Sequence, residues 1–185
     1  MSLFALLWPP PSAGPATQRQ LTGGFSVVAL GLYEGELADQ VRALKYRDET
    51  RWAGSLGARL GALVPPPWRS AALVPIPLHP AKLAARGYNQ AALVARAVGR
   101  RANMPVSFET LARLKETAVQ ARLGRDARAA NAAEAFVALP PRSERGLVLV
   151  DDVVTTGSTL ESAALALRAE GHTVLGALAL ALATD

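Results

Sequence analysis

Short apolar runs and amphipathic stretches alternate along the chain, and this pattern predicts strands and helices in turn. The apolar runs that predict strands are 25–32, 72–76, 104–108, 147–150 and 173–182. The runs at 147–150 and 173–182 are almost free of polar residues, as in strands that are buried on both faces of a parallel sheet. We therefore expect a mostly parallel central sheet.

Four further stretches repeat apolar residues every three or four positions, which is the spacing of an amphipathic helix. They are 35–46, 52–63, 89–101 and 160–168. An Ala- and Arg-rich stretch at 124–133 has little apolar stripe, which predicts a solvent-facing helix. Residues 1–24 are rich in Pro, Gly, Ser and Thr and predict an irregular N-terminal arm. Helices that alternate with strands predict one α/β domain over 25–185, with helices on the faces of the sheet.

Composition excludes several classes of protein. The chain has 185 residues, enough for one domain with a substantial core, and half of them are apolar. It contains no cysteine, which excludes disulfides and thiolate metal sites, and two histidines cannot form a metal site alone. No apolar window reaches the length of a membrane span, and the apolar residues 3–8 are too few for a signal peptide. We expect a cytoplasmic protein without a membrane span.

The net charge is +5, and the basic charge is concentrated in one part of the chain. Residues 82–128 contain ten Lys or Arg against three acidic residues, which gives this stretch +7 and leaves −2 for the remainder. Such a segment predicts a polyanionic partner, for example pyrophosphate or single-stranded nucleic acid. A solvated Arg-rich face is the alternative, and charge alone does not separate the two.

The most informative stretch is 146–160, where a pair of carboxylates and a hydroxyl-rich loop follow an apolar run. Asp151 and Asp152 come directly after that run, so we expect them at a strand's carboxyl end, where open α/β sheets bind ligands. The residues that then open the next helix are Thr155, Thr156, Gly157, Ser158 and Thr159. A helix N-terminus with free amides and hydroxyls suits a phosphate, and carboxylates accept hydrogen bonds from ribose hydroxyls. The combination predicts a sugar-phosphate site.

Two adjacent carboxylates repel each other, and this repulsion needs compensation. Hydroxyl groups, a metal ion or cationic side chains near Asp151 and Asp152 would supply it. The alternative interpretation is an ordinary turn between a strand and a helix, in which these residues only cap the helix.

Three other segments carry candidate residues for the same site. The expected strand at 72–76 ends in a proline-stiffened loop formed by Val74, Pro75, Ile76, Pro77 and Leu78. Lys82 and Arg86 follow, and Asn89 is the expected cap of the next helix. The basic segment 113–131, which includes Arg113 and Lys115, suits either a lid over an anion or an exposed helix. Lys45 ends a helix, where it either reaches an anion or complements the helix C-terminus.

These motifs resemble those of type I phosphoribosyltransferases, and in particular the ComF branch, which is linked to competence. The stretch 146–160 is similar to that family's signature for phosphoribosyl pyrophosphate (PRPP). The segments 44–46, 74–77, 86–90 and 113–120 resemble further motifs of the ComF branch. The resemblance covers the chain from about residue 33 to the C-terminus.

The resemblance implies a type I phosphoribosyltransferase fold with a small N-terminal hood, and it implies roles for the motif residues. Asp151 and Asp152 would bind the ribose hydroxyls, with Mg²⁺ nearby through water or ribose, and residues 155–159 would bind the 5′-phosphate. The loop 74–78 would bind pyrophosphate, with Arg86, Arg113 and Lys115 as catalytic candidates that stabilise its departure. The implied reaction transfers phosphoribosyl from PRPP to a nitrogen nucleophile, which the sequence does not identify.

Two other functions stay open. One is a non-catalytic factor that binds single-stranded DNA during DNA uptake and natural transformation, and the other is a PRPP sensor without turnover. Tyr88 and Phe108 are the two aromatic residues within 82–128, so the sequence offers few rings for base stacking. Many ComF-like chains begin with a four-cysteine zinc module, and residues 1–24 stand in its place here. A homodimer also stays open.

Overall fold

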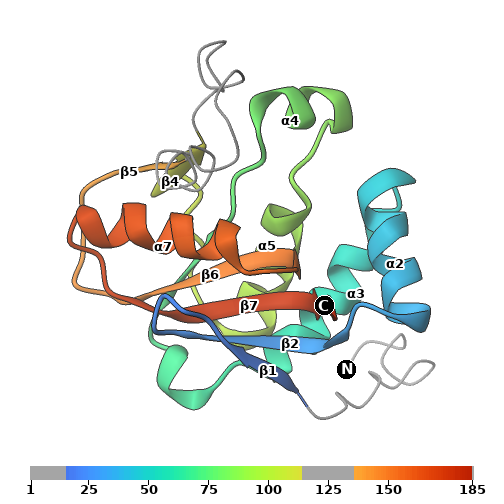
Figure 1. The fold of residues 1–185 in the computed structure, drawn as a ribbon, viewed down its shortest axis with the longest axis horizontal. Coiled ribbons are helices and arrows are strands. Elements are labelled where there is room, and N and C mark those ends of the chain that lie inside the picture. Colours follow the sequence, from blue (N-terminus) through green and yellow to red (C-terminus); the bar gives the residue numbers. More distant parts are fainter. Residues whose placement is uncertain (1–15, 114–135, 185) are drawn as a thin grey trace.

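A five-stranded sheet forms the centre of the computed structural model, which describes residues 16–113 and 136–184 (Figure 1). The strands lie in the order β1-β2-β7-β6-β3, and all neighbouring strands are parallel except β1 and β2. Their bounds are β1 (Thr17–Gln20), β2 (Ser26–Leu32), β3 (Ala72–Pro75), β6 (Leu147–Val154) and β7 (Val174–Leu182). The fold is therefore α/β with a mostly parallel sheet, as the hydrophobic pattern predicted.

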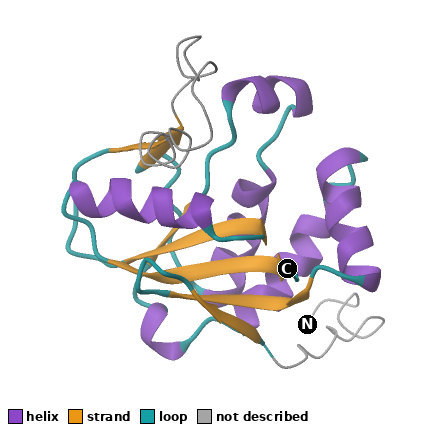
Figure 2. Ribbon diagram, viewed as in Figure 1, coloured by secondary structure: helices purple, strands orange, loops and turns teal. Residues whose placement is uncertain are grey.

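Helices cover both faces of this sheet (Figure 2). They are α2 (Gly35–Tyr46), α3 (Arg51–Ala62), α4 (Pro80–Arg86), α5 (Gln90–Ala102) and α7 (Ser158–Ala169), with a short 3₁₀ helix at Pro66–Trp68. Helix α7 and a small antiparallel pair, β4 (Leu111–Arg113) and β5 (Phe136–Ala138), share one apolar core with the sheet. Helices α2, α3 and α5 share a second core on the opposite face. None of the helices in the described ranges is both long and apolar enough to cross a bilayer.

Glycine lets α3 approach α5 closely. A Cβ atom at Gly57 would lie 2.5 Å from the Cβ of Ala97, and one at Gly61 would lie 2.8 Å from the Cβ of Arg101. Both distances are shorter than real contacts between carbon atoms, so these two positions require glycine. The packing matters for function because α5 begins at the candidate site.

The structure differs from the predicted elements at several places, and it adds α4, β4 and β5, which the hydrophobic pattern did not predict. Residues 17–20, expected in an irregular arm, form β1 and pair with β2. Residues 104–108 form a single bridge, between Val106 and Leu73, rather than a strand, and Pro105 has no N–H to extend the ladder. Strand β6 continues to Val154 instead of ending at residue 150. The helix expected at 124–133 lies outside the described residues.

Candidate functional site

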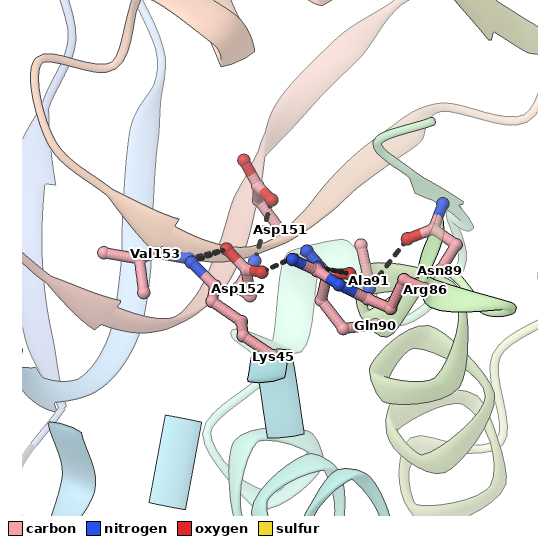
Figure 3. Close-up of polar contacts among 8 residues, drawn as sticks. All are labelled: Lys45, Arg86, Asn89, Gln90, Ala91, Asp151, Asp152 and Val153. Atoms are coloured by element: carbon pink, nitrogen blue, oxygen red, sulfur yellow. Dashed lines mark hydrogen bonds and ion pairs between the residues drawn. The ribbon is translucent and has the colours of Figure 1, made fainter. Parts of the chain in front are cut away.

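Strand β6 directs its two adjacent carboxylates to opposite faces of the sheet. Side chains alternate along a strand, and β6 continues through both Asp151 and Asp152. Asp151 therefore follows Leu149 toward the core that contains α7, whereas Asp152 follows Val150 toward the core that contains α2, α3 and α5. Figure 3 shows the two carboxylates pointing apart. The sequence predicted a pair at a strand tip, and the longer strand gives its members different surroundings.

Asp152 is buried, with 4% of its surface exposed, and protein groups bind both of its oxygens. Its Oδ1 forms an ion pair with Lys45 Nζ at 2.9 Å and accepts a hydrogen bond from the Val153 N–H at 2.6 Å. Its Oδ2 accepts a hydrogen bond from Gln90 Nε2. Lys45 lies in the last turn of α2, so the anion that it reaches in this structure is Asp152.

The side chain of Gln90 connects Asp152 to a second cation, Arg86. Arg86 Nη1 donates a hydrogen bond to Gln90 Oε1 at 2.6 Å (Figure 3). The Arg86 guanidinium also lies 5.4 Å from the centroid of the Tyr46 ring, which is close enough for a cation–π contact. Arg86 is therefore held from two sides, by an amide and by an aromatic ring.

The proline-rich loop after β3 is attached to α5 through Asn89. Asn89 Nδ2 donates to the Ile76 carbonyl at 2.9 Å, and its Oδ1 accepts from the Ala91 N–H at 2.9 Å. The second contact confirms that Asn89 is the N-cap of α5. In the predicted pyrophosphate loop, Val74 and Pro75 lie buried in β3, and Ile76, Pro77 and Leu78 line the cavity described next.

Asp151 lines a cavity of about 210 Å³ at the carboxyl end of the sheet. The cavity is bounded by the end of α2, the loop after β3, and parts of α4, α5, β4, β6 and α7. Its charged lining residues in the described part of the chain are Lys45, Lys82, Arg86, Arg113, Asp151 and Asp152. Since one carboxylate is already paired with Lys45, the remaining cations make this cavity attractive to an anion.

Asp151 is half-buried at the cavity, and its carboxyl group has few partners. Its Oδ1 accepts a hydrogen bond from the Asp152 N–H at 2.8 Å, and no other described group bonds to it. Burial and the neighbouring Asp152 carboxylate raise the pKa of Asp151 to about 7, although the hydrogen bond from the Asp152 N–H and the cations Lys45 and Arg113 act in the opposite direction. A ligand that donates hydrogen bonds or carries a cation would favour its ionised form.

Residues 155–159 form a hydroxyl-lined turn that leads into α7 beside the cavity. Gly157 has a φ of +87°, a conformation that glycine adopts without strain. Thr159 lines both the cavity and a small hollow of about 20 Å³ over the turn. Amides without an acceptor among the described residues are those of Thr155, Thr156, Gly157, Thr159 and Leu160. Free N–H groups at a helix N-terminus suit an anionic oxygen.

The connection between β1 and β2 packs against this turn and fixes its position. A Cβ atom at Gly157 would lie 2.5 Å from Leu21 Cδ2, so glycine is also needed for this close approach. Arg19 donates a hydrogen bond to the Thr155 carbonyl, and Glu161 accepts one from a backbone N–H of the β1–β2 connection at 3.1 Å. Sequence reasoning missed these contacts because residues 1–24 have no regular pattern that indicates a partner.

Most of the predicted site residues meet at this edge of the sheet. Arg86 and Arg113 line the cavity with Asp151, and residues 155–159 adjoin it. Lys115 and the rest of the predicted lid lie outside the described residues. Gln90 was not predicted as a site residue, although its place within the motif 86–90 was a usable signal.

The donor groups of the site fit Mg²⁺ that arrives together with a phosphorylated ligand. Among the described residues, no group of three or more His, Asp or Glu side chains could hold a metal ion by itself. Asp152 is paired with Lys45, which leaves Asp151 as the open carboxylate. Mg²⁺ commonly binds one or two carboxylates together with substrate phosphates, so a single open carboxylate is sufficient.

A larger hollow, of about 420 Å³, lies between the loops 141–145 and 171–173, next to the amino ends of β6 and β7. Most of its lining residues are exposed, and it contains neither a carboxylate at a strand's carboxyl end nor a helix N-terminus. The smaller cavity at Asp151 is therefore the better candidate for a functional site.

The chain matches no protein-family model, and no curated protein matches it. The function is therefore inferred from the site and from the sequence motifs.

Proposed function

We propose that the chain is a PRPP-binding protein that resembles phosphoribosyltransferases, with the fold of the type I enzymes. The observation that supports this most is the open carboxylate of Asp151 in a cation-lined cavity, next to several free amides within residues 155–159. PRPP carries a matching group for each part, because it combines vicinal hydroxyls, a 5′-phosphate and a pyrophosphate.

In the proposed complex, the ribose hydroxyls donate hydrogen bonds to Asp151, and the 5′-phosphate accepts them from the amides and hydroxyls of 155–159. The pyrophosphate lies along the loop 76–78, near Lys82 and Arg86, which line the same cavity. Two prolines flank Ile76 in that loop, and their fixed φ angles reduce the entropy lost when the loop holds a ligand.

The proposed reaction breaks the bond between C1′ and the pyrophosphate oxygen and forms a bond from C1′ to a nitrogen nucleophile. Mg²⁺ would be held by Asp151 and ligand oxygens, and the chemistry it supplies is neutralisation of charge on pyrophosphate. Arg86 and Arg113 line the cavity and would stabilise the charge that gathers on the departing group. Lys115 is assigned the same role from the resemblance.

Thermal unfolding with and without PRPP and Mg²⁺ tests the binding. A ligand that binds only the folded protein stabilises it by about 2.7 kcal/mol at 100 times its Kd, so the melting temperature should rise. Asp151→Asn should abolish the rise, because the amide is a weaker acceptor for hydroxyls and a poor partner for Mg²⁺. Asp39→Asn is the matched control, since the Asp39 side chain on α2 is 74% exposed. An equal rise in both variants would remove Asp151 from the site.

Release of pyrophosphate separates an enzyme from a sensor. The proposed transferase should release pyrophosphate from PRPP when the correct nitrogen nucleophile is present, and a panel of amines and nucleobases covers that class. Binding of PRPP without release across the whole panel would favour the sensor.

A second candidate function, binding of single-stranded DNA during uptake, is supported by the outer face of α5. Arg96, Arg100 and Arg101 are exposed on this helix. The Arg96 guanidinium lies 4.8 Å from the centroid of the Phe108 ring, and Phe108 is itself 44% exposed. A ring next to several cations can stack a base and bind phosphates at once.

Salt dependence tests this second candidate. Binding of an unstructured oligonucleotide should weaken steeply as salt rises, because cations on the protein displace counterions from phosphates. Replacing both Arg100 and Arg101 by Gln should weaken binding and flatten the dependence. Affinity that does not change with salt would exclude this function.

A further inference from the structure

A chain of polar contacts connects four elements around the cavity. Lys45 of α2 is paired with Asp152 of β6 at 2.9 Å, Asp152 accepts a hydrogen bond from Gln90 of α5, and Gln90 accepts one from Arg86 of α4 at 2.6 Å (Figure 3). Two ends of this chain, Lys45 and Arg86, are cations that line the cavity. The two middle members, Asp152 and Gln90, are buried, with 4% and 5% of their surfaces exposed.

The surroundings of Gln90 permit a single orientation of its amide. Its NH₂ group must face Asp152, because a carboxylate only accepts hydrogen bonds, and its oxygen must face Arg86, because a guanidinium only donates them. Rotating the amide by half a turn would place oxygen against oxygen and N–H against N–H. The buried carboxylate of Asp152 therefore fixes the direction in which Gln90 presents its oxygen to Arg86.

The hydrogen bond from Arg86 to the Gln90 oxygen determines the position of the Arg86 guanidinium, which ends a long and flexible side chain. Helix α4 contains no buried residues, so packing of its own side chains does little to fix the Arg86 guanidinium. The Gln90 oxygen holds Nη1, and the Tyr46 ring lies 5.4 Å from the guanidinium carbon. The other guanidinium N–H groups have no acceptor among the described residues, which leaves them for an anion in the cavity.

We infer that Gln90 is a positioning residue, which Asp152 orients and which holds the Arg86 guanidinium toward pyrophosphate in the cavity. Asp152 has its oxygens occupied by Lys45, Gln90 and a backbone amide, so it organises the two cations instead of binding the sugar. Asp151 alone is the carboxylate for the ribose. The inference rests on the proposed function and assigns different tasks to the two adjacent carboxylates.

The test uses two halves of the ligand as separate reporters, each with Mg²⁺ present: inorganic pyrophosphate and ribose 5-phosphate. Gln90→Met keeps the length of the side chain and removes both amide contacts. It should weaken pyrophosphate binding by about tenfold, the factor for one hydrogen bond to a charged group, and should affect ribose 5-phosphate much less. Equal weakening of both ligands, or of neither, would overturn the inference.

A double-mutant cycle shows whether Gln90 acts through Arg86. Arg86→Gln should weaken pyrophosphate binding, and adding Gln90→Met to that variant should cause little further loss, since the shared contact is already gone. A purely structural role for Gln90 would instead give additive losses, and additive losses would contradict the inference.

The two carboxylates provide a second test that does not depend on how well Gln90→Met folds. Asp152→Asn should weaken pyrophosphate binding more than ribose 5-phosphate binding, and Asp151→Asn should do the reverse. Equal effects of the two substitutions on ribose 5-phosphate would show that both carboxylates bind the sugar, and would overturn the assignment. If the unaltered protein binds neither pyrophosphate nor ribose 5-phosphate, the proposed function fails. If the unaltered protein binds both ligands and the variants keep the same ratio of the two affinities, only this inference is rejected.

Discussion

At the scale of single residues, the chemistry of the site follows from the different surroundings of Asp151 and Asp152. Asp152 is buried, but Lys45 and Gln90 compensate its charge. Asp151 faces the cavity without such a partner, and burial together with the neighbouring carboxylate raises its pKa to about 7. Asp152 is therefore a structural carboxylate, whereas the ionised form of Asp151 would be stabilised by hydroxyl groups or by a cation.

The raised pKa of Asp151 predicts how stability depends on pH. The folded protein binds this proton more tightly than the unfolded chain does, so stability should fall as the pH rises from the ordinary aspartate pKa, about 4, toward about 7. Asp151→Asn removes the group, so it should stabilise the protein by about 4 kcal/mol more at pH 8 than at pH 4. Urea unfolding at both pH values measures the difference.

The exposed Asp39 again provides the control. Its side chain is 74% exposed, so Asp39→Asn should not reproduce this pH dependence. If the variant at 151 and the unaltered protein lose stability in parallel between the two pH values, the pKa of Asp151 is not raised.

At the scale of elements, the site depends on how closely α3 packs against α5. Helix α5 carries Gln90 at its first position, and Gly57 and Gly61 of α3 let the two helices approach. Because the first residues of α5 also receive the cap from Asn89, the helix is fixed both at its N-terminus and along its buried side. A substitution at the α3–α5 contact should therefore also alter the geometry of the site.

Two glycines of α3 give a matched prediction. Gly57→Ala places a methyl group against Ala97 and should destabilise the protein by about 1 to 3 kcal/mol through overpacking. Gly54→Ala, on the exposed side of the same helix, has nothing within 4 Å and should stabilise it by about 0.5 to 1 kcal/mol. Chemical denaturation of both variants tests the pair, and a loss at position 54 as large as that at 57 would refute the packing argument.

Elements with a strong hydrophobic period could be predicted from the sequence, whereas contacts between distant polar residues could not. The helix at 35–46 was predicted with the bounds that α2 has, because its apolar face is regular. The end of β6 was placed too early because aspartate rarely occurs in strands, and this error hid the opposite directions of Asp151 and Asp152. The pairing of Arg19 with the Thr155 carbonyl depends on how β1 packs, which no local pattern reports.

At the scale of the whole molecule, the parallel topology brings together residues that are far apart in the sequence. The cavity combines the end of α2, the proline-rich loop after β3, Arg113 of β4 and Asp151 of β6. The loop after β3 and Asp151 meet because β3 and β6 are parallel and end at the same edge of the sheet (Figure 1). The end of α2 and the separate β4–β5 pair bring Lys45 and Arg113 to this edge from outside the five-stranded sheet. The fold thus places a carboxylate, several cations and a helix N-terminus around one cavity, and these are the groups that a phosphorylated sugar requires.

A crystal structure with saturating PRPP and Mg²⁺ would test most directly whether PRPP binds in the cavity at Asp151. The account predicts ribose hydroxyls within hydrogen-bonding distance of the Asp151 carboxylate and the 5′-phosphate at the amides of residues 155–159, with Asp152 still paired with Lys45. PRPP bound elsewhere on the molecule, or a crevice at Asp151 that holds no sugar, would contradict it.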